Sequence, residues 1–436
     1  MKKYEKEELI SKHKEYLMPS VHTTFSEPLC LEKGKGEILY DIDGNEYLDF
    51  YTGIMVVISG HCNDKITKAV SEQIQKLQHS TAFFINRPVV ELAEKLAQIT
   101  PGKLKQSFFV NSGSEAVEGA INLSQIYTKN NTVIGLQHGY HGHTLLTKAL
   151  TAISVWRGGA TNISDIRYTP SAYCYRCPFN ATPENCDVIC ANYLDEVIQT
   201  QTSGEIACVV AEPIQGVGGL ITPPKNYFKV LAEITKSYGG LLIIDEVQTG
   251  FGRTGGKMFA IEHYGVEPDI MSMAKGLANG FAIGAFISNE EIASCFEGPS
   301  VSTFGGNPVS AAAAVANIEY IEENDILNNS EKMGAILKDK LLELKEKYGI
   351  IGDIRGRGLY WGLELVKDKK TKEPACEESE RMIQLCKDEG LIIGQSGSWF
   401  HVLRLGPPLN ITEGRIEEGI EMLDLAFSKL KKWVTV

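Results

Sequence analysis

The sequence predicts an α/β protein with a large, mainly parallel sheet flanked by helices and a smaller α+β domain built from both chain ends. Residues 241–244 are a continuous apolar run, typical of a parallel strand buried on both faces. From about residue 105, several such runs alternate with helical segments. After residue 326 the chain changes to a long charged helix followed by strands. These three observations together favour a two-domain α/β architecture.

The chain of 436 residues is too long for one simple core. We expect an N-terminal segment and hairpin over 1–60, a large domain over 61–325 and a C-terminal domain over 326–436. The turn Asp43-Gly44-Asn45 predicts the hairpin, because it lies between two short apolar runs. Helices are expected within residues 1–20 and over 64–78.

The central part of the chain repeats a strand followed by polar or glycine residues. In open α/β sheets, ligands bind at the carboxyl ends of strands. Five strands therefore predict a site there before any family is considered. The residues that follow these strands are 111–114, 138–142, Glu212, Asp245 and Lys275.

The C-terminal part predicts a compact α+β unit. Its expected elements are a helix over 330–348, strands over 353–359 and 361–366, a helix over 377–389, a strand over 402–405 and a helix over 413–430. A polar surface turn is expected over 367–374.

Composition excludes several classes of function. The formal net charge of -12 argues against nucleic-acid binding, which requires a basic face. No apolar run approaches the ~20 residues of a membrane span, and the charged N-terminus lacks the apolar core of a signal peptide. We therefore expect a cytoplasmic protein that binds small molecules.

Four of the ten cysteines form a C-x2-C-x8-C-x3-C pattern: Cys174, Cys177, Cys186 and Cys190. Without a secretory signal, reduced thiols are expected. The spacing is near that of zinc sites, but its central gap is short for a common zinc module. We predict no tightly bound metal and interpret these cysteines as small residues of a loop or helix, with metal binding as the alternative.

Lys275 ends an apolar strand and is followed by glycine, and Asp245 stands at the end of another buried strand thirty residues upstream. A lysine for a Schiff base and an acid for a pyridinium nitrogen are what a pyridoxal-phosphate enzyme requires of its protein. Ser112 and Glu115 fit a capping box, which predicts a helix N-terminus suited to a phosphate group. These residues predict pyridoxal 5'-phosphate as the cofactor.

Over nearly the whole chain the sequence resembles the class III (omega-type) aminotransferases of pyridoxal-phosphate fold type I, nearest to the members acting on alanine and glyoxylate or on 4-aminobutyrate. Six motifs in this order carry the resemblance: 111–116 (Asn-Ser-Gly-Ser-Glu-Ala), 140–142 (Tyr-His-Gly), 212–216 (Glu-Pro-Ile-Gln-Gly), 245–255 (Asp-Glu-Val-Gln-Thr-Gly-Phe-Gly-Arg-Thr-Gly), 274–276 (Ala-Lys-Gly) and 303–308 (Thr-Phe-Gly-Gly-Asn-Pro).

The resemblance implies a role for each matching residue. Lys275 and Asp245 would be catalytic: Lys275 would hold the cofactor and move the proton, and Asp245 would keep the pyridine nitrogen protonated. Tyr140 and Val247 would pack on the two ring faces, and Gln248 would bind the ring hydroxyl. The implied cofactor-binding residues are Ser112, Gly113, Ser114, Tyr140, His141, Glu212, Asp245, Val247, Gln248, Lys275 and, from the neighbouring subunit of a homodimer, Thr303.

For the substrate, the resemblance implies Arg404, Glu212 and Ile54. Arg404 would bind the α-carboxylate, and Glu212 would pair with Arg404 when a substrate lacks that carboxylate. Where 4-aminobutyrate enzymes carry an arginine, this chain has His143, which favours the alanine–glyoxylate type. Ala282 also departs from the family, in which proline is usual.

The leading hypothesis is an aminotransferase that moves an amino group from an amino acid or omega-amine to pyruvate, glyoxylate or 2-oxoglutarate by a ping-pong mechanism. An amino-acid racemase, an epimerase or a phospho-lyase of the same family is the first alternative, because Lys275 and Asp245 are common to all of them. A non-catalytic binding protein is the second, and the presence of Lys275, Asp245 and Arg404 together argues against it. A homodimer is expected, with a tetramer as the alternative.

Overall fold

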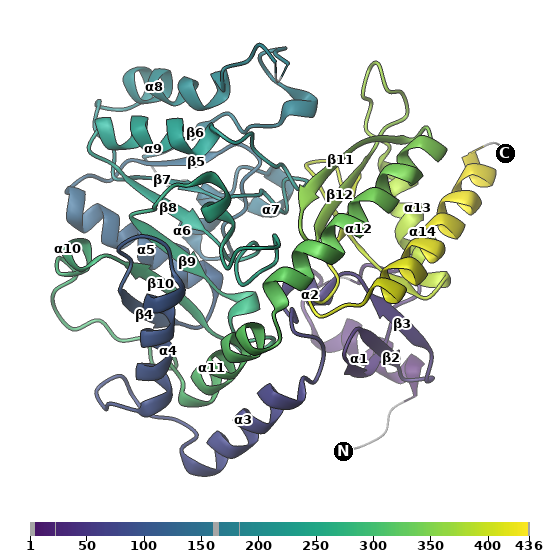
Figure 1. Ribbon diagram of the computed structural model, residues 1–436, viewed down its shortest axis with the longest axis horizontal. Coiled ribbons are helices and arrows are strands. Elements are labelled where there is room, and N and C mark those ends of the chain that lie inside the picture. Colours follow the sequence, from purple (N-terminus) through teal and green to yellow (C-terminus); the bar gives the residue numbers. More distant parts are fainter. Residues whose placement is uncertain (1–4, 22, 160–164, 183, 435–436) are drawn as a thin grey trace.

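The computed structural model describes residues 5–21, 23–159, 165–182 and 184–434. Its centre is a seven-stranded sheet with the order β4-β10-β9-β8-β7-β5-β6 (Figure 1). The strands are β4 (Gln106–Val110), β5 (Val133–Leu136), β6 (Ile166–Thr169), β7 (Cys208–Ala211), β8 (Leu241–Asp245), β9 (Ile270–Met273) and β10 (Gly284–Ser288). Neighbouring strands from β9 to β6 run parallel, whereas β10 is antiparallel to both β4 and β9.

Helices cover both faces of this sheet, which explains its continuous apolar strands. In β8, Leu241 and Ile243 share a core with α5 (Gly113–Thr128), whereas Leu242 and Ile244 belong to the core that contains α8 (Ile189–Gln201) and α9 (Tyr227–Ser237). Because side chains alternate between the faces of a strand, every residue of β8 is buried. Asp245, the last residue of β8, reaches the carboxyl end of the sheet.

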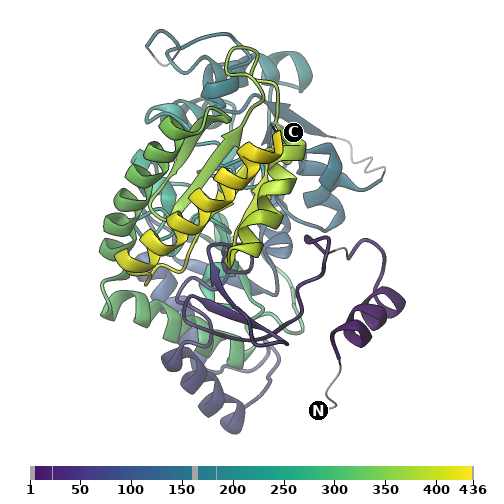
Figure 2. The same cartoon turned by 90° about the vertical axis from the view of Figure 1, so that its right-hand side faces the viewer.

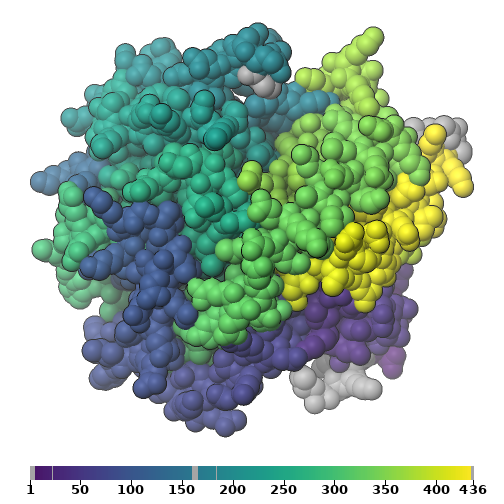
Figure 3. Space-filling view, viewed as in Figure 1, coloured from purple at the N-terminus to yellow at the C-terminus, as the bar shows by residue number. Residues whose placement is uncertain are grey.

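The two chain ends meet in a second sheet with the order β1-β2-β3-β13. The hairpin of β2 (Ile38–Asp41) and β3 (Glu46–Asp49) is antiparallel, as predicted. Strand β13 (Leu391–Ile392) pairs in parallel with β3, and β1 (Leu31–Lys35) pairs with β2. The purple N-terminal and the green and yellow C-terminal segments accordingly lie together at one side of the molecule (Figure 3).

A third sheet has the order β11-β12-β15-β14, with β11 (Ile351–Arg357), β12 (Tyr360–Leu365), β14 (Gly394–Ser396) and β15 (Val402–Leu405). The long helices α12 (Ile326–Lys347), α13 (Cys376–Asp388) and α14 (Glu413–Val434) pack around it (Figure 2). The remaining helices of six residues or more are α1 (Lys6–Tyr16), α3 (Asp64–Lys76), α4 (Arg87–Ile99), α6 (Leu145–Leu150) and α11 (Pro308–Glu323).

The predicted fold class is confirmed, and all five predicted strands of the large sheet are present. The strands that sequence reasoning missed are β1, β6, β10, β13 and β14. Strand β13 has only two residues and forms because it pairs with β3, so no local sequence pattern predicts it. The domain boundaries at residues 60 and 325 stay a prediction. Among the described helices, none has the length and apolar character that crossing a membrane requires.

Candidate active site

Lys275 lies two residues after the end of β9 and begins the short 3-10 helix η3 (Lys275–Leu277). Its φ of 43° places the backbone in the left-handed region, which turns the chain sharply after the strand. In the described part of the chain, the Lys275 amine forms no ion pair. Burial and the Arg404 charge lower the Lys275 pKa to about 7, against the opposing effect of Asp245 and Glu212. A lysine in this state is a nucleophile and a base near neutral pH.

Asp245 and His141 form a buried pair at the end of β8. Asp245 Oδ2 lies 2.8 Å from His141 Nδ1, and Asp245 Oδ1 accepts from the Val247 backbone N–H at 3.1 Å. Burial opposes protonation of His141, but the Asp245 hydrogen bond and charge outweigh it and raise the His141 pKa. His141 Nε2 is buried without a hydrogen-bond partner. The pair therefore holds the Asp245 carboxylate in a fixed orientation.

Helix α5 begins at Gly113, beside this pair. The Ser112 hydroxyl accepts from the Glu115 N–H at 3.2 Å, as the capping-box prediction required. In a capping box the Glu115 carboxylate would accept from the Ser112 N–H. Here it accepts instead from the N–H of Asn111, one residue earlier, at 2.6 Å. A Cβ at Gly113 would lie 3.0 Å from Val247 Cγ1, so the absence of a side chain keeps this helix N-terminus open. Free N–H groups and a partial positive charge at such an end suit a phosphate group.

These elements enclose one cavity of about 290 Å³. The predicted site residues that line it are Ile54, Gly113, Ser114, Tyr140, His141, Glu212, Asp245, Val247, Gln248, Lys275 and Arg404. Two predicted residues do not line it, namely Ser112, which caps α5, and Thr303, which is exposed on the loop before α11.

Glu212 and Arg404 form no ion pair with each other in this structure, and the pair expected when a substrate lacks an α-carboxylate stays a prediction. The Glu212 carboxylate accepts from the backbone N–H groups of Tyr140 and Gly216, each at 3.0 Å. Burial raises the Glu212 pKa to about 7, which these two bonds and the neighbouring His141 oppose. Glu212 therefore already has partners, and its ionisation is finely balanced at neutral pH.

Arg404 is bound by neutral partners instead. Its Nη2 donates to Gln248 Oε1 and to the Tyr360 hydroxyl, at 3.2 Å for the latter. Tyr360 also donates to Gln248 Oε1 at 2.8 Å. Arg404 Nε is buried without a partner, so the guanidinium retains donor capacity for an anion in the cavity. Gln248 orients Arg404 through Oε1 and also lines the cavity, so its expected contact with the cofactor stays a prediction.

Comparison with known proteins decides the family. Residues 20–427 match the family described as aminotransferase class-III. The chain is 39% identical over 423 residues to alanine–glyoxylate aminotransferase 2 homolog 2 of Arabidopsis thaliana, covering 97% of this chain and 87% of that protein. It is 38% identical over 434 residues to the leucine/methionine racemase of Thermococcus litoralis, covering 98% and 96%. A solved structure of a Bacillus anthracis aminotransferase superposes with a TM-score of 0.91 at 34% identity, covering 98% and 100%.

The chain belongs to the class III aminotransferase family. Its cofactor is pyridoxal 5'-phosphate, and its architecture is that of fold type I. The cavity fits this group. The Lys275 amine has no ion pair among the described residues, the N-terminus of α5 is open at Gly113, and the Asp245 carboxylate is buried, all around the same space. When bound, the cofactor supplies an electron sink for a substrate carbanion.

The aminotransferase cavity also contains residues that the sequence did not single out: Tyr51, Trp156, Val217 and Gln395. The Trp156 ring meets those of Tyr140 and Phe400 edge to face, at 5.8 and 5.9 Å between centroids. Val217 could have been predicted as a site residue, because it lies in the glycine-rich stretch that follows Glu212. No sequence pattern marks Trp156 or Gln395, because only the tertiary fold brings them to the cavity.

The four clustered cysteines line a different cavity of about 450 Å³. All four are free thiols, and no three His, Cys, Asp or Glu side chains among the described residues are arranged to hold a metal ion. Burial and the neighbouring thiols raise the pKa of Cys190 to about 12, which disfavours the thiolate that a metal binds.

We expect elemental analysis of aminotransferase purified without chelator to find no stoichiometric metal. Cys174→Ser should consequently leave the metal content and the melting temperature nearly unchanged, because surface substitutions are usually within about 0.5 kcal/mol. Stoichiometric zinc that is lost in Cys174→Ser would contradict this prediction.

Proposed function

We propose that this aminotransferase moves an amino group from an amino acid or omega-amine to a 2-oxo acid by a ping-pong mechanism in two half-reactions. The observation that carries the proposal is the placement of Lys275 and the Asp245–His141 pair in the same cavity as Arg404. Lys275 and the Asp245–His141 pair would serve the cofactor, and Arg404 would serve the carboxylate of the substrate. Both half-reactions can then use one pocket.

Each residue has a defined task in this proposal. The Lys275 amine, with its lowered pKa, takes the proton from the reacting carbon of the substrate and returns it in the opposite half-reaction. Asp245, fixed by His141, would stabilise a proton on the ring nitrogen of the bound cofactor. Arg404 binds the substrate carboxylate through its unpaired Nε and its neighbouring N–H groups.

The cavity favours an acceptor with a single carboxylate. Among the described residues that line it, Lys275 and Arg404 are the only lysine or arginine side chains. The substrate side is otherwise formed by Tyr51, Trp156 and Val217, which offer no charge for a second carboxylate. Pyruvate or glyoxylate therefore fits better than 2-oxoglutarate, and the Arabidopsis relative is named for alanine and glyoxylate.

A substrate panel tests the proposal directly. Amino acids and omega-amines are each combined with pyruvate, glyoxylate and 2-oxoglutarate, and the new amino acid is measured by chromatography. We expect the highest kcat/KM with pyruvate or glyoxylate. Lack of amino transfer to every acceptor would overturn the proposal.

Racemisation is the second candidate function, and the racemase relative from Thermococcus litoralis favours it. Epimerisation and phosphate elimination use the same Lys275 and Asp245. Incubating the enzyme with an amine donor in the absence of a 2-oxo acid distinguishes these reactions. A transaminase converts its cofactor stoichiometrically to the amine form and releases a 2-oxo acid, whereas a racemase inverts the amino acid without consuming it.

We expect Arg404→Ala to impair the half-reaction with 2-oxo acids by ~10–100-fold, since a charged hydrogen bond is worth about 1.5–3 kcal/mol. The half-reaction with an amine that lacks an α-carboxylate should be much less affected. Single-turnover rates with each substrate measure this split.

Glu212→Gln should show the opposite preference, because the Glu212 carboxylate is needed near Arg404 only when no substrate carboxylate is present. The glutamine can still accept one backbone N–H from Tyr140 or Gly216, so the loop geometry is largely retained.

Equal losses in both half-reactions for Arg404→Ala would mean that Arg404 is structural and would remove the dual-substrate interpretation.

A homodimer completes the proposal. Thr303 is exposed, and the loop that carries it borders a groove formed with Ala82 and residues 84–86. Phe83, Phe84 and Ile85 are also exposed, Ile85 to 94%. Such an apolar surface is typical of an interface. Thr303 would then bind the phosphate in the partner's site, and sedimentation of the purified protein should give twice the mass of one chain.

A further inference from the structure

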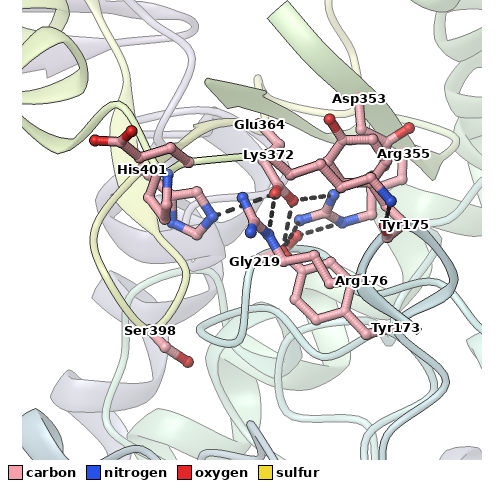
Figure 4. A network of polar contacts seen from close by, with 12 residues as sticks. Tyr173, Tyr175, Arg176, Gly219, Asp353, Arg355, Glu364, Lys372, Ser398 and His401 are labelled. Atoms are coloured by element: carbon pink, nitrogen blue, oxygen red, sulfur yellow. Dashed lines mark hydrogen bonds and ion pairs between the residues drawn. The ribbon is translucent and has the colours of Figure 1, made fainter. Parts of the chain in front are cut away.

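A second polar cluster, which the proposed function does not use, is centred on Glu364 of β12 (Figure 4). The Glu364 side chain is fully buried. Its Oε1 accepts from Arg176 Nε at 2.5 Å, and its Oε2 accepts from the Tyr173 hydroxyl at 2.5 Å and from Arg355 Nη1 at 2.7 Å. Burial alone would raise the Glu364 pKa, but His401 and Arg355 outweigh it and hold this pKa far below its usual range.

The cluster joins two parts of the chain that are distant in sequence. Tyr173 and Arg176 lie between β6 and α8, beside the seven-stranded sheet, whereas Arg355 and Glu364 belong to the third sheet. Arg355 also packs its guanidinium 4.7 Å from the centre of the Tyr173 ring. The contacts therefore fix the third sheet against the large sheet.

From the cluster, contacts lead to a loop that lines the active-site cavity. Arg355 Nε donates to the Gly219 carbonyl at 2.7 Å. Two residues earlier in the same loop, Val217 lines the cavity, and its carbonyl accepts from Gly397 N at 2.8 Å. Arg355 thus determines where the Val217 wall of the cavity lies.

The cluster also fixes the strand that carries Arg404. In the register of β12 and β15, Glu364 pairs with Val402 and Gly362 pairs with Arg404. His401, just before β15, lies 3.3 Å from Glu364 through its Nε2. The loop between β14 and β15 is tied as well, since Ser398 Oγ lies 2.8 Å from His138 Nδ1. Contacts of Glu364 thus reach the Val217 loop through Arg355 and the start of β15 through the neighbouring His401.

We propose that Glu364 is a positioning residue that sets the affinity for the 2-oxo acid by holding the Val217 loop and the Arg404 strand in place, without touching the substrate. The inference rests on the proposed function, because Arg404 is taken as the site of the substrate carboxylate. Stability alone does not explain the cluster. Replacing a buried ion pair by apolar residues is often neutral or stabilising, so buried charges are weak evidence for a purely stabilising role.

Three variants test this role at increasing severity. Tyr173→Phe removes one hydrogen bond to Glu364, Arg355→Lys keeps the charge but loses the contact with Gly219, and Glu364→Gln removes the carboxylate. Tyr227→Phe is the matched control, because Tyr227 is equally buried and its hydroxyl donates to Pro170 O, outside the cluster. Should Glu364→Gln fail to fold, the two milder variants decide.

We expect KM for the preferred 2-oxo acid to rise ~10-fold in Arg355→Lys and Glu364→Gln, with kcat changed less than about threefold, as a loss of ground-state binding predicts. Tyr173→Phe should show a smaller rise, and the Tyr227→Phe control none. The visible absorbance of the lysine-bound cofactor should stay unchanged, because Lys275, Asp245 and His141 lie on other elements. Folded variants with an unchanged KM, or with losses confined to kcat, would overturn the role.

Hydrogen exchange provides a readout that does not depend on activity. Amides of 215–221 and 397–401 should exchange faster in Arg355→Lys and Glu364→Gln than in the parent or in Tyr227→Phe. Unchanged exchange in both segments would refute the positioning role even if KM rose. If the parent protein transfers no amino group at all, the proposed function fails, whereas the exchange result still shows whether Glu364 holds these two loops.

Discussion

Lys275→Ala should abolish covalent attachment of the cofactor and lower turnover on the order of 10³-fold or more, because it removes both the nucleophile and the proton-transfer base. The amine of Lys275 faces the cavity at the end of β9, where no described carboxylate forms an ion pair with it. Lys275→Arg is the matched control, since it keeps a cation but cannot attach the cofactor. Both variants should lack the visible absorbance of the lysine-bound form.

The pKa of Lys275 adds a pH dependence to the same prediction. With a pKa lowered to about 7, the amine is largely neutral above pH 7 and becomes protonated below it. Because only the neutral amine is a nucleophile, cofactor uptake by the protein stripped of its cofactor should slow as the pH falls from 8 to 6. Mass spectrometry after borohydride reduction identifies the modified residue. A reduced cofactor still attached to Lys275→Ala would show that another lysine forms the bond.

The sequence was sufficient for Lys275, Asp245 and the cap of α5, because these depend on local rules. A buried parallel strand delivers its next residue to the carboxyl end of the sheet, and the five predicted strands all do so. The capping box is likewise a pattern of neighbouring residues, and its hydrogen bond from the Glu115 N–H to the Ser112 hydroxyl is present. Short-range patterns therefore predict which of these residues lie together at the carboxyl end of the sheet.

Contacts between distant segments account for what the sequence could not predict. His141 bonds to Asp245 across 104 positions, and Gln248 bonds to Arg404 across 156. The sequence also did not indicate that Glu212 accepts from two backbone N–H groups, one of which lies only four residues away. Glu364 stands in a strand of otherwise ordinary pattern, and only the contact of the third sheet with the segment between β6 and α8 shows what surrounds it.

Asp245→Asn should retain bound cofactor but lower the rate of the amine half-reaction by ~10²-fold or more, the range typical of such electrostatic and acid–base effects. An asparagine Oδ1 can still accept from the Val247 N–H, and its NH2 group can donate to His141 Nδ1 when the imidazole is neutral and carries its proton on Nε2. What disappears is the negative charge that keeps the ring nitrogen of the cofactor protonated. The loss should therefore appear in single-turnover rates and leave cofactor affinity largely intact.

Asp269→Asn is the matched control for this substitution. Asp269 precedes β9, and its carboxylate accepts from the Leu242 N–H at 2.8 Å near the start of β8, so this substitution removes a charge beside the other end of the same strand. Burial raises the Asp269 pKa, and its removal should affect folding stability more than turnover. If Asp245→Asn reacted within a few-fold of the parent, or no more slowly than Asp269→Asn, the carboxylate at the end of β8 would be a fixed structural partner of His141 and would not control the protonation of the cofactor.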